Sequence, residues 1–126
     1  MAEHILIVDD DREIRELLAN YLNRNGMSAS AAANGRQMWA ALEEGPVDLI
    51  VLDVMMPNLD GPGTLRALRA EPALAKIPIV FMTAKAMPAE VASLKALGAI
   101  DVIPKPFDPM SLATTLRALF ARSQQA

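Results

Sequence analysis

The stretch LIVLDVMMPNLDG, residues 49–61, is the part of the sequence that decides the fold. It opens with four apolar residues, reaches the acidic Asp53, and ends in the turn-forming pair Asp60–Gly61. A continuously apolar strand suits the interior of a parallel sheet that is covered on both faces. We therefore predict a buried strand over residues 49–52 that is followed directly by a carboxylate.

Similar short apolar runs recur on both sides of this stretch. They predict four further strands, over residues 5–8, 28–32, 77–82 and 100–103. Helical periodicities separate the five runs, so strands and helices alternate. This alternation predicts an α/β fold with right-handed crossovers and a doubly wound parallel sheet, (βα)5. Ligands of such sheets bind beyond the carboxyl ends of the strands.

The helices carry one-sided apolar stripes and recognisable ends. Asp11, Asn34 and Asp108 are expected N-caps, and Gly26 and Gly98 stand where helices should end. Further residues are expected on the buried stripes of the first, second and fourth helices: Ile14, Leu17, Leu18, Tyr21, Leu22, Trp39, Val91, Leu94 and Leu97.

Length and composition indicate one packed domain over residues 1–122 with a short polar tail at 123–126. The chain has 126 residues, of which 52% are apolar, and its net charge of -3 argues against nucleic acid or an anionic membrane as the main partner. It contains no cysteine, signal-peptide pattern or membrane-length apolar run. We expect a cytoplasmic protein whose partner is a protein or a small anion.

Polar residues follow four of the five predicted strands at one edge of the sheet. These are Asp9–Asp11, Asp53, Thr83 and Lys105. Clustered carboxylates repel one another, and a hard cation such as Mg²⁺ relieves that repulsion. Lys105 and Thr83 could then hold a phosphoryl group next to Asp53, which is the plausible nucleophile.

Four motifs together resemble the response-regulator receiver family, the CheY-like domains. They cover nearly the whole chain and occur in family order: ILIVDDD (5–11), LIVLDVMMPNLDG (49–61), IVFMTAKA (79–86) and IPKPF (103–107). Intervals of 43, 30 and 22 residues separate Asp10, Asp53, Thr83 and Lys105 and are close to the family's spacing. The resemblance implies a flavodoxin/CheY-like sheet with strand order 2-1-3-4-5.

The resemblance also implies roles for individual residues. Asp9 and Asp10 would be the acidic pair that holds Mg²⁺, and Asp53 would be the phosphoacceptor. Met55 would give its backbone carbonyl to the metal. Thr83 would be the switch hydroxyl, and Lys105 would be the cation paired with the phosphoryl group, followed by a cis peptide to Pro106.

The implied function is that of a single-domain response regulator in a two-component or phosphorelay system. A histidine kinase or a histidine phosphotransfer protein would donate the phosphoryl group, and the chain would catalyse only its own phosphorylation and dephosphorylation. The fourth helix, fifth strand and fifth helix, roughly residues 88–122, would then bind a protein target. Alternatively, the chain would pass the phosphoryl group along a relay.

This sequence departs from the family pattern at Val102, where many members carry an aromatic residue that moves during switching. We therefore expect switching to rely on Thr83 and the loop over residues 84–88, which begins with Ala84, with little change at Val102. Met55 and Lys85 occupy positions that influence the access of hydrolytic water, and an apolar Met55 is expected to slow dephosphorylation.

Two alternative functions stay open at this point. A haloacid-dehalogenase-like phosphatase also uses an Asp nucleophile with Mg²⁺, and Asp9–Asp11 contains the required two-apart pair. The motif around Asp53 and the missing cap domain argue against it. A phosphorylation-independent binding module of receiver-like fold is the other alternative, and retention of the matched site residues argues against it.

Overall fold

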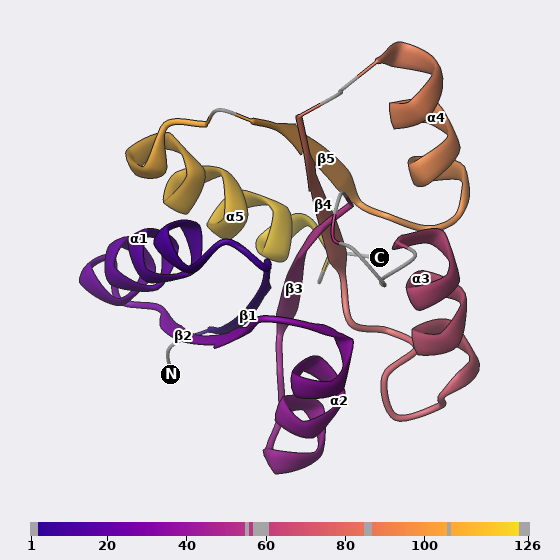
Figure 1. Cartoon of the computed structure of the whole chain (residues 1–126), viewed down its shortest axis with the longest axis horizontal. Coiled ribbons are helices and arrows are strands. Elements are labelled where there is room, and N and C mark those ends of the chain that lie inside the picture. The colour runs from indigo at the N-terminus through magenta and orange to yellow at the C-terminus, as the bar shows by residue number, and fades with distance from the viewer. Residues whose placement is uncertain (1–2, 55, 57–60, 85–86, 106, 124–126) are drawn as a thin grey trace.

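The computed structural model describes residues 3–54, 56, 61–84, 87–105 and 107–123 (Figure 1). Strands and helices alternate through these ranges. Their bounds are β1 (His4–Val8), α1 (Arg12–Arg24), β2 (Ser28–Ala32), α2 (Gly35–Glu44), β3 (Leu49–Asp53), α3 (Gly61–Ala70), β4 (Ile79–Thr83), α4 (Pro88–Ala96), β5 (Asp101–Pro104) and α5 (Pro109–Ser123).

The five strands form one parallel sheet in the order β2-β1-β3-β4-β5, which confirms the expected doubly wound topology. The predicted start of β4 at Ile77 is wrong by two residues. The amide of Ile77 donates to the carbonyl of Leu74 at 3.2 Å, and Pro78 has no amide hydrogen, so the strand begins at Ile79.

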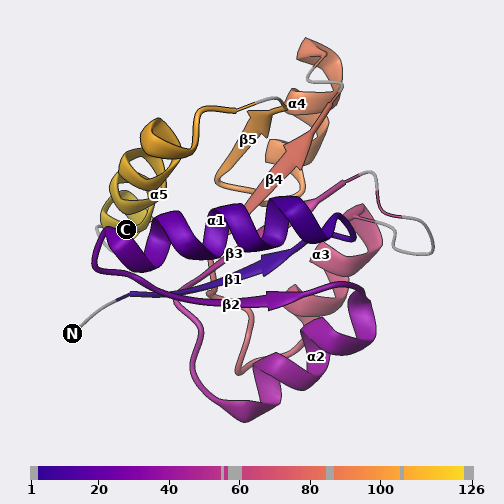
Figure 2. The same ribbon diagram turned by 60° about the vertical axis from the view of Figure 1, so that its left-hand side comes forward.

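Helices cover both faces of the sheet. Figure 1 and Figure 2 show α1 and α5 on one side and α2, α3 and α4 on the other. Two separate groups of buried apolar side chains fill the two interfaces. The strands contribute to both groups because successive side chains point to opposite faces.

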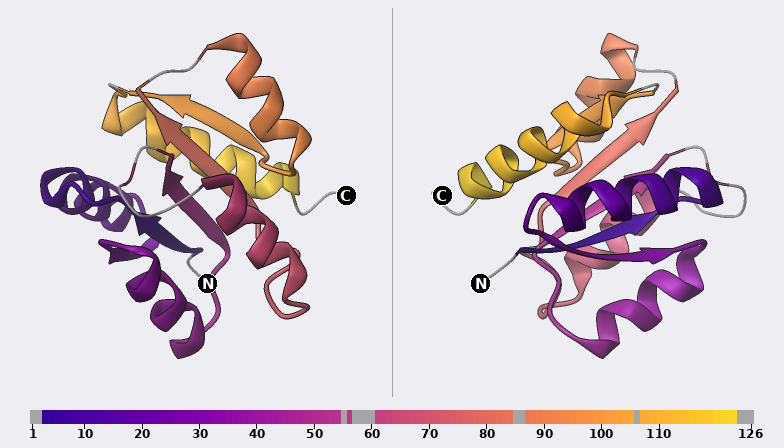
Figure 3. Two further views of the ribbon diagram at one scale, coloured as in Figure 1. Left: turned by 45° about the vertical axis from the view of Figure 1, so that its right-hand side comes forward. Right: turned by 90° about the vertical axis from the view of Figure 1, so that its left-hand side faces the viewer.

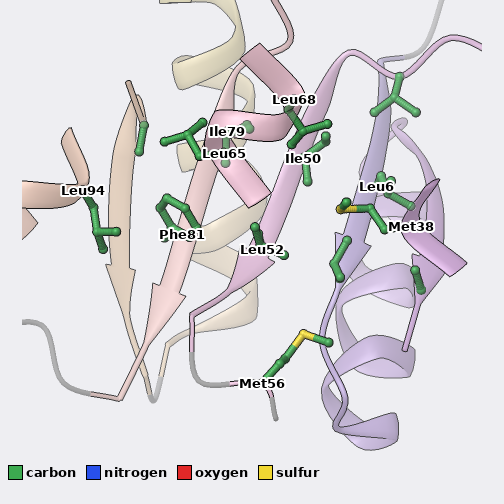
Figure 4. Packing of buried hydrophobic residues seen from close by; sticks show 14 of the residues in the cluster. Leu6, Met38, Ile50, Leu52, Met56, Leu65, Leu68, Ile79, Phe81 and Leu94 are labelled. Carbon is green, nitrogen blue, oxygen red and sulfur yellow. The ribbon is translucent and has the colours of Figure 1, made fainter. Parts of the chain in front are cut away.

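The core beneath α3 shows how closely the helices approach the sheet. Leu65, Leu68, Ile79 and Phe81 belong to one group of packed side chains, and all four are fully buried (Figure 4). A Cβ atom at Gly61 would lie 3.2 Å from the Phe81 ring, so the first residue of α3 has little room for a side chain.

The expected helix ends are confirmed. Asp11 accepts hydrogen bonds from two amides of the first turn of α1, and Asn34 does the same for one amide of α2. Asp108 accepts from the amide of Met110 at 3.1 Å in α5. Gly26 and Gly98 adopt positive φ angles of 82° and 117°, a region that favours glycine at helix C-termini.

Three expectations about burial need correction. Leu17 was placed on the buried stripe of α1 but is 41% exposed, and Leu97 of the fourth-helix stripe is 37% exposed. Trp39 is only half-buried against the core beneath α2. Leu97 is the C-cap residue of α4, so the apolar stripe reaches solvent at the end of the helix. Within the described ranges, no helix has both the length and the apolar character that a membrane crossing requires.

Candidate phosphoryl and metal site

The carboxyl edge of the sheet carries the polar residues that the sequence singles out. Asp9 follows β1, Asp53 ends β3, Thr83 ends β4, and Lys105 follows β5. Parallel strands present their carboxyl ends at one edge, so residues far apart in the chain meet there (Figure 3). Asp9, Asp53 and Thr83 are buried. Burial is unusual for the two carboxylates and indicates compensating interactions.

Three carboxylates form a compact cluster at this edge. Ligand oxygens of Asp9, Asp10 and Asp53 all lie within 4.8 Å of one another. Asp9 and Asp53 are buried, whereas Asp10 is exposed. Hard oxygen donors that are partly open to water suit Mg²⁺, which keeps several of its waters and needs only one or two carboxylates. The donor set therefore fits a divalent cation of this kind.

Lys105 joins the two buried carboxylates electrostatically. Its Nζ lies 2.9 Å from Oδ2 of Asp9, to which it donates a hydrogen bond, and 3.4 Å from Oδ2 of Asp53. Burial of the ammonium group works against its charged form. The hydrogen bond to Asp9 and the negative charges of Asp9 and Asp53 outweigh that effect and raise the pKa of Lys105 above its ordinary value.

Backbone contacts fix the orientation of Asp9. Its amide donates to the carbonyl of Ala32 at 3.1 Å, which extends the pairing of β1 and β2 by one residue. Its Oδ1 accepts the amide of Asp11 at 2.9 Å. Arg15, on the first turns of α1, donates from Nη1 to the Asp9 carbonyl at 2.8 Å. Arg15 was not predicted from the sequence, because a contact between a helix and the strand end before it leaves no periodic signal.

Thr83 lies beside the cluster through the sheet register. Asp53 is the partner of Met82 across β3 and β4, so Thr83 is the next residue along the neighbouring strand. Its carbonyl accepts the amide of Lys105 at 2.8 Å. The backbones of the threonine and the lysine are thus tied to each other at the edge that holds Asp53.

The remaining predicted site residues divide into two groups. Val102 is buried in the core beneath α2, α3 and α4, and Ala84 is exposed directly after Thr83. Met55, Lys85 and Pro106 lie outside the described residues, and so does Asp60 of the predicted turn. The predictions for the Met55 carbonyl, the Lys85 side chain and the cis peptide before Pro106 therefore stay predictions.

The class defined by these features is a doubly wound α/β protein with an acidic, lysine-paired site at its carboxyl edge. The family described as response regulator receiver domain matches residues 5–117. This match covers most of the chain, and the chain therefore belongs to the response regulator receiver domain family, whose members are phosphoacceptor switches in two-component signalling.

Curated relatives and solved structures agree with this assignment. The transcriptional regulatory protein GltR of Pseudomonas aeruginosa is 42% identical over 120 residues, which are 95% of this chain and 50% of that protein. The transcriptional regulatory protein CpxR of Escherichia coli is 39% identical over 119 residues, 94% of this chain and 50% of that protein. The chain thus spans about half the length of the curated relatives it matches.

Among solved structures, the chemotaxis response regulator CheY4 of Vibrio cholerae superimposes with a TM-score of 0.87 and 31% identity. The alignment covers 94% of this chain and 99% of that chain. The receiver domain of a signal transduction histidine kinase from Syntrophus aciditrophicus gives a TM-score of 0.84 with 33% identity, covering 99% and 95% of the two chains.

Proposed function

We propose that this receiver accepts a phosphoryl group on Asp53 in an Mg²⁺-dependent reaction and uses the phosphorylated state to bind a protein target or to pass the group on. The observation that carries this proposal is the double ion pair of Lys105 with Asp9 and Asp53. This pairing brings together the proposed nucleophile Asp53, the proposed metal ligand Asp9, and a lysine whose charge can pair with phosphoryl oxygens. All three lie in one partly buried site.

Asp9, Asp10 and Asp53 would hold the metal, together with the backbone carbonyl of Met55. When bound, Mg²⁺ neutralises negative charge on the carboxylates and on the phosphoryl oxygens. Lys105 balances the same charge through its ion pairs with Asp9 and Asp53. The chain's own contribution is to fix Asp9 through its hydrogen bonds with Ala32, Asp11 and Arg15, so that the carboxylates need no rearrangement.

The transfer step is a displacement at phosphorus. A carboxylate oxygen of Asp53 attacks the phosphorus of a phosphohistidine, a new O–P bond forms, and the N–P bond breaks with its electron pair left on the imidazole nitrogen. Lys105 pairs with one oxygen of the transferred group, and the Thr83 hydroxyl donates to another. Water later cleaves the acyl phosphate and returns Asp53 to its carboxylate form.

The change between the inactive and active conformations is expected to depend on the hydroxyl of Thr83. Phosphorylation adds roughly -1.5 to -2 charges, and the cations offset these locally, so the effect is a shift between conformations that already exist. Val102 is too short to act as an aromatic lever, so we expect switching to rely on Thr83 and on the loop over residues 84–88 that begins at Ala84. The target-binding face would comprise α4, β5 and α5.

Several partner assignments belong to this proposal. A histidine kinase or a histidine phosphotransfer protein is the expected donor, as the family implies. A protein target in the cytoplasm, with neither nucleic acid nor membrane in direct contact, fits the net charge of -3. The proposal includes a receiver domain over residues 1–122 with a tail at 123–126, and the family match over residues 5–117 lies within these bounds.

Amide NMR with Mg²⁺ and beryllofluoride, which mimics a phosphoryl group, tests the proposal. Wild type should show shifts centred on Asp53, Thr83 and Lys105. Asp53→Asn should show no shifts beyond those that Mg²⁺ alone produces, whereas Asp11→Asn should respond like wild type because asparagine also caps a helix. Shifts that persist in Asp53→Asn would point to a different acceptor, and no response in wild type would favour a phosphorylation-independent binding module.

A further inference from the structure

A groove lies between α2 and α3, toward the amino edge of the sheet and away from the phosphoryl site. Two adjoining cavities of about 520 and 330 Å³ form it, and they share Leu42, Glu43, Ala73 and Leu74. Figure 1 and Figure 3 show α2 and α3 on the same face of the sheet. The larger volume lies within the range of about 300–1,000 Å³ that is typical of binding pockets.

The groove combines an apolar surface with acidic borders. Trp39, Leu42 and Leu74 line the larger cavity and are half-buried, and Trp39 is the only tryptophan in the chain. Among the described residues that line the two cavities, the charged ones are Glu43 and Glu71, which are both exposed. An indole face next to two carboxylates offers attraction to a cation and none to an anion.

One wall of the groove is held in place by the hydrogen bonds of a half-buried arginine. Arg69 donates hydrogen bonds from Nη1 to the carbonyls of Ala75 at 3.0 Å and Ile77 at 2.8 Å. The amide of Leu74 donates to the carbonyl of Glu71 at 2.9 Å. The segment that carries Glu71 and Leu74 is therefore fixed before any partner arrives, which lowers the entropic cost of binding.

We propose that this groove docks an arginine-containing apolar segment of a partner protein. A guanidinium group is planar and weakly hydrated, so it can stack on the Trp39 ring while it pairs with Glu43 or Glu71. Apolar side chains next to the arginine would cover Leu42 and Leu74. Like-charge repulsion from the two carboxylates disfavours an acidic segment. The proposal concerns a surface that is separate from the phosphoryl site and does not rest on the proposed function.

Fluorescence of Trp39 gives a direct readout. The probe is the pentapeptide acetyl-Leu-Arg-Leu-Arg-Leu-amide, added up to millimolar concentration. We expect a saturable change in Trp39 emission that weakens with added salt. The double variant Glu43→Gln/Glu71→Gln should bind about tenfold more weakly, a change of roughly 1.4 kcal/mol. Glu44→Gln, an exposed glutamate of α2 outside both cavities, should bind like wild type.

A second peptide with glutamine in place of both arginines separates charge recognition from apolar contact. It should bind about tenfold more weakly than the arginine peptide. Equal binding of the two peptides, or equal binding by the double variant, would overturn the proposal. A Trp39 emission that shows no saturable change with the arginine peptide would also overturn the proposal. An emission shift that follows self-association in sedimentation would overturn it too, because a second copy of the chain would then occupy the groove. The experiment is repeated in Asp53→Asn, where binding should be unchanged.

Discussion

Lys105 has two tasks at the level of single residues. In the resting protein it pairs with Asp9 and Asp53, which are 0% and 3% exposed, and compensates their negative charges. In the proposed reaction it also pairs with the incoming phosphoryl group. The first task makes the lysine important for stability as well as for chemistry.

Lys105→Ala should therefore lower the free energy of unfolding in the absence of Mg²⁺ by about 2 kcal/mol. The two carboxylates lose their ammonium partner and repel each other. Urea unfolding measures the effect. Lys95→Ala is the matched control, because the ion pair of Lys95 with Asp101 is 3.6 Å long and half-exposed, and it should change the free energy by less than about 1 kcal/mol. An equal loss in both variants would contradict the role given to Lys105.

Asp10 and Asp11 are adjacent and exposed, yet they should differ in their effect on Mg²⁺. Asp10 belongs to the carboxylate cluster, whereas Asp11 caps α1. Asp10→Asn should weaken Mg²⁺ binding by about tenfold or more, because one anionic ligand is lost. Asp11→Asn should bind nearly as wild type. Calorimetric titration provides the affinities, and a reversed order would remove Asp10 from the proposed metal site.

At the level of elements, the connections at the amino edge depend on one side chain. Arg69 of α3 donates to the carbonyls of Ala75, Ile77 and Gly98. It thereby joins the end of α3, the segment before β4 and the turn after α4. Burial lowers the pKa of Arg69, although the group stays charged at neutral pH.

Arg69→Ala should destabilise the protein by about 2 kcal/mol, because three carbonyls lose a charged donor. Arg66→Ala lies on the same helix at an exposed position and should stay within about 0.5 kcal/mol of wild type. Thermal unfolding of the two variants compares them directly. A loss as small for Arg69→Ala as for Arg66→Ala would show that the segment before β4 holds its shape without the arginine.

The elements themselves were largely predictable from sequence. Continuous apolar runs indicated the strands, and Asp11, Asn34 and Asp108 marked the helix starts, because both signals are local. The contacts of Arg15 with Asp9 and of Arg69 with three carbonyls were not predictable. A long side chain that crosses between elements leaves no periodic pattern, and its partners are backbone groups that every residue has.

The candidate site was predictable only in part. The sequence predicted that Asp9, Asp53, Thr83 and Lys105 would share an edge, since parallel strands end together. It did not reveal that Lys105 bridges two buried carboxylates, because burial depends on the helices that pack around the strand ends. The residue types alone suggested Asp53 as nucleophile with Lys105 and Thr83 beside it. The family resemblance added the metal carbonyl of Met55 and the switch role of Thr83.

At the level of the whole molecule, the parallel sheet separates two kinds of surface. Its carboxyl edge gathers the acidic cluster, and its amino edge carries the groove between α2 and α3. A ligand that binds only the folded state stabilises the whole domain. Binding of a cation to the acidic cluster is therefore measurable as an increase in the free energy of unfolding of the whole domain.

Mg²⁺ should raise the free energy of unfolding by about 2.7 kcal/mol at a concentration one hundred times its dissociation constant. Relief of repulsion among the three carboxylates is the physical cause. Urea unfolding with and without Mg²⁺ measures the difference. At the same Mg²⁺ concentration, Asp10→Asn should lose about half of this stabilisation or more, because tenfold weaker binding leaves about 1.4 kcal/mol. An undiminished effect in that variant would mean that the metal binds elsewhere.

Intact-mass measurement after incubation with Mg²⁺ and acetyl phosphate tests the central proposal most directly. The account predicts that wild type and Asp11→Asn gain the mass of one phosphoryl group, that peptide mapping assigns it to Asp53, and that Asp53→Asn gains none. Equal phosphorylation of Asp53→Asn, or no phosphorylation of wild type, would contradict the account.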